Sequence, residues 1–307
     1  MKKINNTLIG GQTNSYTNKY QQQNRTSLFA SYKYSFNEDR LTGIASVRKE
    51  FVLNYKVPLT YSTGLNFKLL HCLYLQGNVN KVYRIPTLND LYWSPGGNPN
   101  LKPEEGYSED VGLNLNIAIK KIELKSNVNV FKKNIDNWIM WLPQSGGIWS
   151  PINIAKVVST GLESNSSFTF YISKTKVMLG VNTTYVVSTN QKVLNENDES
   201  IGKQLMYVPM YNGSTNLTLT YKKFYFNYNQ TYTGYRYTSS DNYEYLHPYT
   251  LGNIQSNYKF ILKKYEATIS VQVNNIWNTT YQVVRQQAMP LRNFQLAIYL
   301  KHHEENK

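Results

Sequence analysis

Neighbouring carboxylates and histidines are the residues that could carry acid–base chemistry in this chain. They are Glu104-Glu105, in a long connecting segment, and His302, His303, Glu304 and Glu305, close to the C-terminus. A general acid or base needs a nucleophile or a bound substrate held beside it, and neither pair of carboxylates has a nucleophile or a strained turn nearby. These groups are interpreted as solvated, and the chain is predicted not to be an enzyme.

Residues that bind metals are few and scattered. The chain has four histidines and one cysteine, Cys72, and no Cys/His cluster has zinc spacing. A single cysteine also excludes a disulfide within the chain. We therefore predict no metal site and no cofactor.

Residues 82–106 form a connecting segment that is rich in Pro, Gly and Asn. A connection of this length is usually functional or disordered. Its prolines lack an N–H, so they end strands and set restricted corners, and Glu104 could accept hydrogen bonds where the segment returns, with Arg84 as a candidate partner. The residues expected to brace the segment are Arg84, Pro86, Asn98, Pro99, Pro103 and Glu104.

The elements around this segment are predicted to be strands. From Tyr107 the odd positions are mostly apolar up to Ile119, whereas the even positions are Ser, Asp, Gly, Asn and Ala. Similar runs begin at Tyr61, Ile122 and Phe294. Period-2 alternation with one apolar face is typical of β-strands, and we find no long window with helical periodicity. The sequence predicts about fourteen strands of roughly 8 to 15 residues.

Short and long connections alternate along the chain. Tight turns are predicted at 37–39, 70–71, 120–121, 173–175, 222–223 and 262–264, and longer connections near 12–26, 51–57, 82–106, 134–152, 189–206, 236–249 and 274–291. In an antiparallel meander this places every short turn at one edge and every long loop at the other. Long strands, one-sided loops and tyrosines near strand ends favour an up-and-down transmembrane β-barrel over a soluble β-sandwich.

Charge and hydropathy agree with this interpretation. The net charge is +14, but the Lys and Arg residues sit in pairs at predicted turns and form no continuous stripe that would follow a nucleic-acid backbone. Lysines at turns suit an anionic membrane surface, so lipid and not nucleic acid is the predicted partner. The mean hydropathy of −0.50 is compatible with a barrel, in which only every second residue faces lipid.

The chain resembles the barrel part of TonB-dependent outer-membrane receptors. The resemblance rests on "NVNKVYRIPTLNDLYW", "GGNPNLKPE" and "YSEDVGL", then "VSTGLES", "GKQLMYVPMYNGSTNLTLTY", "YTGYRYTSSDNYEYLHPYTLGN" and "VNNIWNTTYQVVRQQAMPLRNFQL", in family order. Two residues depart from the family pattern: Leu291 stands where a Gly is usual, and His302 where the terminal aromatic would lie.

The resemblance implies location in the outer membrane and TonB-dependent uptake of a scarce nutrient such as a ferric siderophore, haem or cobalamin. It implies residues 1–300 as a partial barrel and 301–307 as a polar tail, with TonB acting only through a plug domain that this sequence does not resemble. The alternative is a surface-binding β-protein, or a receptor remnant, without transport. Aromatic residues assigned to the long loops are the candidate ligand contacts. They are Tyr92, Trp93, Trp138, Trp141, Trp149 and Tyr237.

Overall fold

The computed structural model describes residues 4–17, 22–37, 40–144, 146–192, 199–262 and 265–302. The strands are β1 (Ile4–Thr17), β2 (Gln22–Phe36), β3 (Leu41–Val52), β4 (Leu59–Leu70), β5 (Leu73–Arg84), β6 (Glu104–Ile119), β7 (Ile122–Pro143), β8 (Trp149–Ile172), β9 (Thr175–Asn190), β10 (Tyr211–Tyr221), β11 (Phe224–Thr233), β12 (Arg236–Tyr237), β13 (Tyr245–Leu246), β14 (Tyr249–Leu262), β15 (Tyr265–Asn274) and β16 (Asn293–His302). One short helix, α1 (Leu88–Tyr92), lies between β5 and β6.

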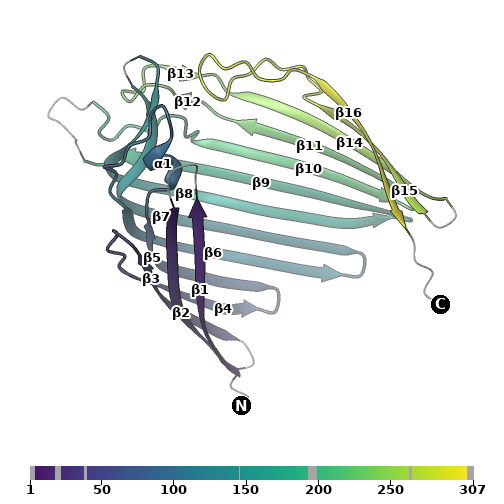
Figure 1. The fold of residues 1–307 in the computed structure, drawn as a ribbon. Helices are drawn as coiled ribbons and strands as arrows, with labels where there is room; N and C mark the ends of the chain where they lie inside the picture. Colours follow the sequence, from purple (N-terminus) through teal and green to yellow (C-terminus); the bar gives the residue numbers. More distant parts are fainter. Residues whose placement is uncertain are drawn as a thin grey trace. The chain divides into compact units, whose positions relative to one another are not determined.

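Fourteen of these strands form one antiparallel meander. Each strand neighbours the next along the chain from β1 to β11, and then β14, β15 and β16 follow (Figure 1). The two remaining strands, β12 and β13, form a small separate hairpin. The prediction of an all-β, up-and-down meander of about fourteen strands is confirmed.

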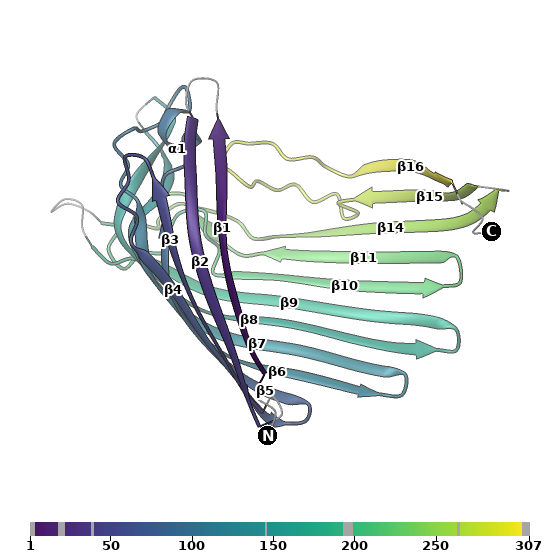
Figure 2. The ribbon, with the colours of Figure 1, turned by 60° about the horizontal axis from the view of Figure 1, so that its bottom comes forward.

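The chain divides into two compact units. Unit 1 comprises residues 1–113, 129–161 and 187–205, which include β1–β5 and the long-loop ends of β6–β9. Unit 2 comprises residues 114–128, 162–186 and 206–307, which include the other ends of β6–β9 and all of β10–β16. In unit 2, the short turns after β6, β8 and β10 lie at the same end of their hairpins (Figure 2).

The two faces of the sheet differ in polarity because successive side chains of a strand point to opposite faces. In unit 2, Val271 pairs with Leu296 and Ile269 with Ile298, and Leu296 and Ile298 are 71% and 63% exposed. The opposite face of unit 2 carries amides and hydroxyls, such as the hydrogen-bonded Asn216, Asn227 and Thr218. An exposed apolar face and a polar face in each strand are the arrangement of a lipid-facing barrel wall.

Most tight turns lie where they were predicted. Lys120, Ser173 and Lys222 begin two-residue turns and have positive φ angles of 49°, 54° and 51°. A left-handed first residue matches the twist of the strands on either side of a two-residue hairpin turn. The predicted turns at 37–39 and 262–264 fall partly outside the described residues.

Two predicted long connections are wrong. Residues 12–17 and 22–26 belong to β1 and β2, in which Thr13 pairs with Thr26, and β7 and β8 occupy most of 134–152. The physical reasons differ. The ends of β1 and β2 carry few apolar residues, and side-chain hydrogen bonds across the strands, such as Gln22 to Ser15 at 3.0 Å, accompany the backbone ladder there. In β7, residues 138–142 are all apolar and Ile139 is buried against Leu91 and Leu101, so the strand continues without alternation.

The strands β7 and β8 are also longer than expected, at 22 and 24 residues. At the chain end, β16 continues through Lys301 and His302, and the ring of His302 packs edge-on against Tyr265 at 5.3 Å. Residues 303–307 of the predicted tail, with Glu304 and Glu305, lie outside the described residues. In the described part of the chain, no helix is long and apolar enough to cross a bilayer.

Candidate functional site: the brace of the long loop in unit 1

An ion pair closes the loop between β5 and β6. Arg84, the last residue of β5, donates from Nε to Oε2 of Glu104, the first residue of β6, at 2.7 Å, and from Nη2 to Oε1. A planar guanidinium and a carboxylate that meet through two hydrogen bonds fix direction as well as distance. The predicted partnership of Arg84 and Glu104 is confirmed, and it joins the two ends of the intervening 85–103 loop.

Glu104 also ties this loop to β7. Its side chain is 9% exposed, and Oε1 accepts a hydrogen bond from the backbone N–H of Ile139 at 2.7 Å. A buried carboxylate is costly unless it is paired and hydrogen-bonded, and here both conditions are met. The carboxylate of Glu104 therefore fastens three segments at once: the end of β5, the start of β6 and the last few residues before the end of β7.

The short helix α1 forms because Thr87 and Asp90 cap it. Thr87 Oγ1 accepts from the backbone N–H of Asp90 at 3.1 Å, and Asp90 Oδ2 accepts from the backbone N–H of Thr87 at 2.9 Å. This reciprocal capping box satisfies donors that a helix start would otherwise leave free. Pro86 precedes it and is fully buried, so the proline ends β5 and fixes where the helix begins.

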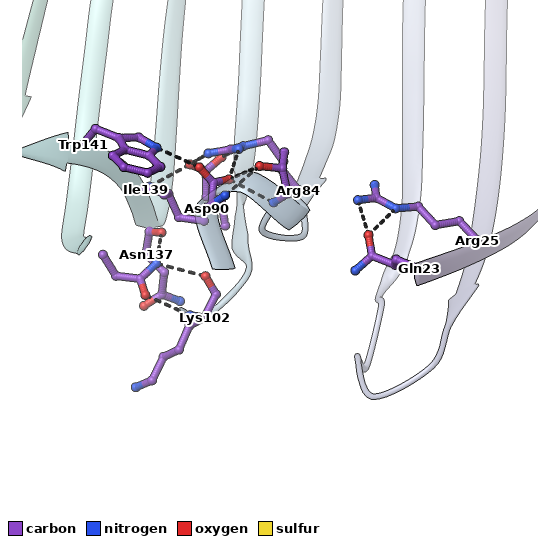
Figure 3. A network of polar contacts seen from close by, with 11 residues as sticks. Gln23, Arg25, Arg84, Asp90, Lys102, Asn137, Ile139 and Trp141 are labelled. Carbon is purple, nitrogen blue, oxygen red and sulfur yellow. Dashed lines mark hydrogen bonds and ion pairs between the residues drawn. The ribbon is translucent and has the colours of Figure 1, made fainter. Parts of the chain in front are cut away.

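Asp90 links α1 to both Arg84 and Trp141. Its Oδ1 accepts from the indole N–H of Trp141 at 2.9 Å, and its Oδ2 lies 3.5 Å from Nη1 of Arg84 (Figure 3). Burial disfavours the charged form, but the hydrogen bonds from Thr87 and Trp141, together with the charge of Arg84, outweigh it. The pKa of Asp90 therefore lies below its usual value. Asp90 is an anion that the loop is arranged to hold.

The returning half of the loop is tied to β8. Asn98 Nδ2 donates to the carbonyl of Pro151 at 3.0 Å, and Asn98 Oδ1 accepts from the N–H of Asn100 at 3.0 Å. Asn153 accepts from the N–H of Lys102 at 2.8 Å and donates to the carbonyl of Lys102 at 2.9 Å. Pro99 and Pro103 have no N–H, so the backbone donors of this half of the loop are the N–H groups of Asn100 and Lys102.

Apolar contacts and glycines complete the packing of the loop. Leu91 of α1 and Leu101 pack against Ile139 of β7, and all three are buried. A side chain at Gly106 would place its Cβ 1.9 Å from the carbonyl oxygen of Asn134, and one at Gly97 would lie 2.6 Å from the backbone nitrogen of Trp93. Only glycine fits at either position.

The candidate ligand contacts are not all in loops. Tyr92 ends α1 and Trp93 follows it, and they are 39% and 56% exposed. Trp138 and Trp141 lie within β7, and Trp149 begins β8, all three half-buried. The indole N–H of Trp141 is already bonded to Asp90. Tyr237 is in unit 2, in β12, where its carbonyl accepts from the N–H of Tyr207 at 2.8 Å.

Sequence reasoning missed Asp90, Asn153 and Arg236. The "T-x-x-D" spacing of Thr87 and Asp90 was a readable capping signal, whereas Asn153 offered no local signal. Arg236 in unit 2 is 3% exposed and donates to the carbonyls of Gln282, at 2.8 Å, and His247, at 3.2 Å. Its guanidinium also lies 4.8 Å from the ring centre of Tyr249. Burial lowers the pKa of Arg236.

A family model described as TonB-dependent receptor-like β-barrel matches residues 3–276. The vitamin B12 transporter BtuB of Vibrio vulnificus (strain YJ016) is 26% identical over 279 residues, which are 90% of this chain and 41% of that protein. The vitamin B12 transporter BtuB of Photobacterium profundum is 24% identical over 241 residues, 77% of this chain and 37% of that protein. This chain thus spans less than half the length of the curated relatives it matches.

Solved structures share the fold. A variant of the ferric enterobactin receptor PfeA from Pseudomonas aeruginosa superposes with a TM-score of 0.66 at 18% identity, over 91% of this chain and 45% of that one. The copper transporter OprC superposes with a TM-score of 0.67 at 13% identity, over 90% of this chain and 48% of that one. At these identities the likeness concerns the fold alone.

Proposed function

Because the chain belongs to the TonB-dependent receptor-like β-barrel family, we propose that it forms part of the outer-membrane barrel of a receptor that takes up a small-molecule nutrient. The nutrient is a scarce, large and partly aromatic or metal-bearing molecule of the type of a ferric siderophore, haem or cobalamin. TonB supplies energy through a plug domain, whereas this chain contributes barrel wall and loops. Catalysis has no part in this function.

The observation that carries the proposal is the brace around Glu104. A receptor must hold its long loops in a defined shape if they are to recognise a ligand, because ordering a floppy loop on binding costs affinity. Arg84, Glu104, Asp90 and Trp141 fix the 85–103 loop to β5, β6 and β7 without using any exposed ring. Tyr92 and Trp93 are consequently presented on a fixed support.

Exposed aromatic rings on a rigid support suit planar ligands. Tyr92 and Trp93 offer large apolar faces with polar edges that can remain in water. The neighbouring Trp141 has a structural task, so we assign it the role of a support and not of a first contact. Trp138, Trp149 and Tyr237 stay candidates for ligand contact.

Equilibrium binding tests this function. The receptor that contains this chain is titrated with cobalamin, ferric enterobactin and haem, and binding is followed by tryptophan fluorescence. We expect one ligand class to bind, and Tyr92→Ala and Trp93→Ala each to weaken it by about tenfold, the effect of losing one stacked ring. Tyr171→Ala is the control, because Tyr171 is similarly exposed, at 46%, but lies beside the short turn after β8.

The outcome also separates transport from simple surface binding. Uptake of the labelled ligand by cells that depends on TonB supports a receptor. Binding that is never followed by TonB-dependent uptake supports the surface-binding alternative. Failure of all three ligands, with Tyr92 and Trp93 variants indistinguishable from the parent protein, contradicts the proposed site.

A further inference from the structure

Five lysines lie at the short turns that end three neighbouring hairpins of unit 2, β6–β7, β8–β9 and β10–β11. All five are exposed, and they are Lys120, Lys121, Lys174, Lys222 and Lys223. The three turns lie at the same end of their hairpins (Figure 2). Neighbouring strands are about 4.8 Å apart, so successive turns along this edge are separated by about 10 Å. We call these five residues the lysine row.

The lysine row carries charge that the protein itself does not neutralise. Among the described residues, none of the five lysines forms an ion pair. The carboxylates of Glu123 and Glu266, at this end of unit 2, are already paired with Lys125 at 2.6 Å and with Lys259 at 2.9 Å. At physiological ionic strength the Debye length is about 8 Å, so the fields of turns about 10 Å apart still overlap. The row therefore attracts anions from outside the chain.

Exposed apolar side chains border each turn of the row. They are Ile119 and Ile122 at the first turn, Ile172 at the second, and Tyr221 and Phe224 at the third. The ammonium group of Lys222 lies over the ring of Tyr221, 5.3 Å from its centre. A cation above an aromatic ring at the end of an apolar band suits the boundary between water and membrane. The ammonium groups thus lie at headgroup level, beside side chains that can contact acyl chains.

We propose that the lysine row binds anionic phospholipids of the phosphatidylglycerol type, in the membrane leaflet on the side of the short turns. The phosphate pairs with the lysines of a turn, and the acyl chains lie along the apolar side chains that border it. Phosphatidylethanolamine carries the same phosphate but adds an ammonium group, which the unpaired lysines repel. The row therefore selects lipids by headgroup charge.

The inference rests on the proposed function only in that the sheet must lie in the outer membrane, where short turns of barrels face the periplasm. It makes no use of the nutrient or of TonB. The lipid site and the nutrient site are therefore tested separately.

Native mass spectrometry measures the selection. The receptor that contains this chain is extracted in mild detergent with equal amounts of phosphatidylglycerol and phosphatidylethanolamine, and the lipid that stays bound is counted. We expect phosphatidylglycerol to be retained in preference, and replacement of all five lysines by Gln to remove the preference. One lysine near an anionic surface contributes about fivefold to binding, so Lys174→Gln should lower the ratio of retained phosphatidylglycerol to phosphatidylethanolamine by up to about fivefold.

Matched variants separate charge from structure. Lys174→Arg keeps the charge and should select phosphatidylglycerol like the parent protein. Lys176→Gln removes the same charge two residues away, but Lys176 pairs with Thr220 and so belongs to the alternation of Thr218 on the polar face. It should behave like the parent protein. Circular dichroism of the variant without the five lysines checks that the strands are kept, since the substitutions lie in turns.

Equal retention of the two lipids by the parent protein would overturn the inference, and so would an unchanged preference in the variant without the five lysines. Peptidoglycan, an anionic polymer, is the competing occupant and is tested by cosedimentation. Lysine-dependent cosedimentation without lipid selection would assign the row to the cell wall instead. If phosphatidylglycerol is selected but no nutrient binds, only the proposed function fails. If a nutrient binds but both lipids are retained equally, only the lipid site fails.

Discussion

Two arginines secure long loops in this chain, Arg84 in unit 1 and Arg236 in unit 2, and their surroundings differ. Arg84 has a side chain that is 43% exposed, and it meets two carboxylates, Glu104 and Asp90. Arg236 is 3% exposed and meets backbone carbonyls and the ring of Tyr249. The first loop is held by a partly exposed cation and two buried carboxylates, whereas the second is held by one buried cation that donates hydrogen bonds to backbone carbonyls.

The difference predicts how each loop can be loosened. A brace made of carboxylates can be weakened by removing charge on either partner and by acid. The backbone carbonyls that Arg236 binds do not titrate, so acid should leave these hydrogen bonds intact and replacement of Arg236 is needed to remove them. Hydrogen exchange measured peptide by peptide follows both loops in the same sample.

The largest effect is expected for Arg236→Met. The substitution leaves the carbonyls of Gln282 and His247 buried without a donor, at about 1–3 kcal/mol each, so the opening free energy of residues 275–292 should fall by about 3 kcal/mol. Arg236→Lys should lower this opening free energy by nearly as much, because an ammonium group cannot both reach the two carbonyls and stack on Tyr249. Arg285→Gln is the control: its pair with Glu244 is exposed and should contribute less than about 1 kcal/mol. Equal effects at 236 and 285 would contradict a buried cation as the holding group.

A somewhat smaller effect is expected for Arg84→Met. It leaves the carboxylate of Glu104 buried without a cation, and since Arg84 itself is partly exposed we expect a loss of about 2 kcal/mol in the opening free energy of residues 85–103. The double variant Arg84→Met/Glu104→Gln should recover part of the loss, because the buried charge is then gone. No recovery would mean that Arg84 acts through its packing and not through its charge.

Acid should loosen the first loop and spare the second. The pKa of Asp90 lies below its usual value in the folded protein, so its contribution to stability is fully present above about pH 4 and is lost as the pH falls through the folded-state pKa. Exchange protection of residues 85–103, measured on samples equilibrated at each pH, should therefore be constant from about pH 8 to about pH 5 and fall below about pH 4. Residues 275–292 are the internal control. If both loops lost protection together, the acid effect would belong to the whole protein and not to the brace.

The smallest effect is expected for Trp141→Phe. The substitution keeps a ring in β7 but removes the indole N–H that binds Asp90. Because Trp141 is only half-buried, we expect a loss of about 1.5 kcal/mol, the lower end for a hydrogen bond to a charged group. Trp138→Phe in the same strand is the matched control and should change exchange of residues 85–103 little. If the two variants behave alike, the hydrogen bond to Asp90 is not what links α1 to β7.

The same two regions show how far the sequence could be interpreted. Alternation predicted the meander, and the positions of Arg84 and Glu104, one on each side of the proline-rich segment, predicted their pairing. Both inferences rest on local patterns. Asn153 and Arg236 escaped because their partners, Lys102 and Gln282, lie about fifty residues away along the chain, and such pairings depend on which strand ends meet.

The failures at residues 12–26 and 134–152 have different causes. Alternation between apolar and polar residues arises where only one face of a strand is covered, so it fades where the described ends of β1 and β2 are mostly exposed on both faces. The backbone ladder needs no such pattern, and a hydrogen bond between the hydroxyls of Thr13 and Thr26 accompanies it. In β7, by contrast, residues 138–142 are all apolar and the loop buries Ile139, so the strand continues there without alternation.

In the proposed outer-membrane location, the length of β7 and β8 has a consequence for access from outside the cell. A bilayer takes up about ten residues of a tilted strand, so roughly half of each of these two strands would project beyond it. Their connection turns at Gly146 and Gly147, where a side chain at either position would meet no atom within 4 Å. A hairpin tip of this kind offers room for an inserted epitope tag. Antibody staining of such a tag on intact cells would report orientation while leaving the Glu104 brace untouched.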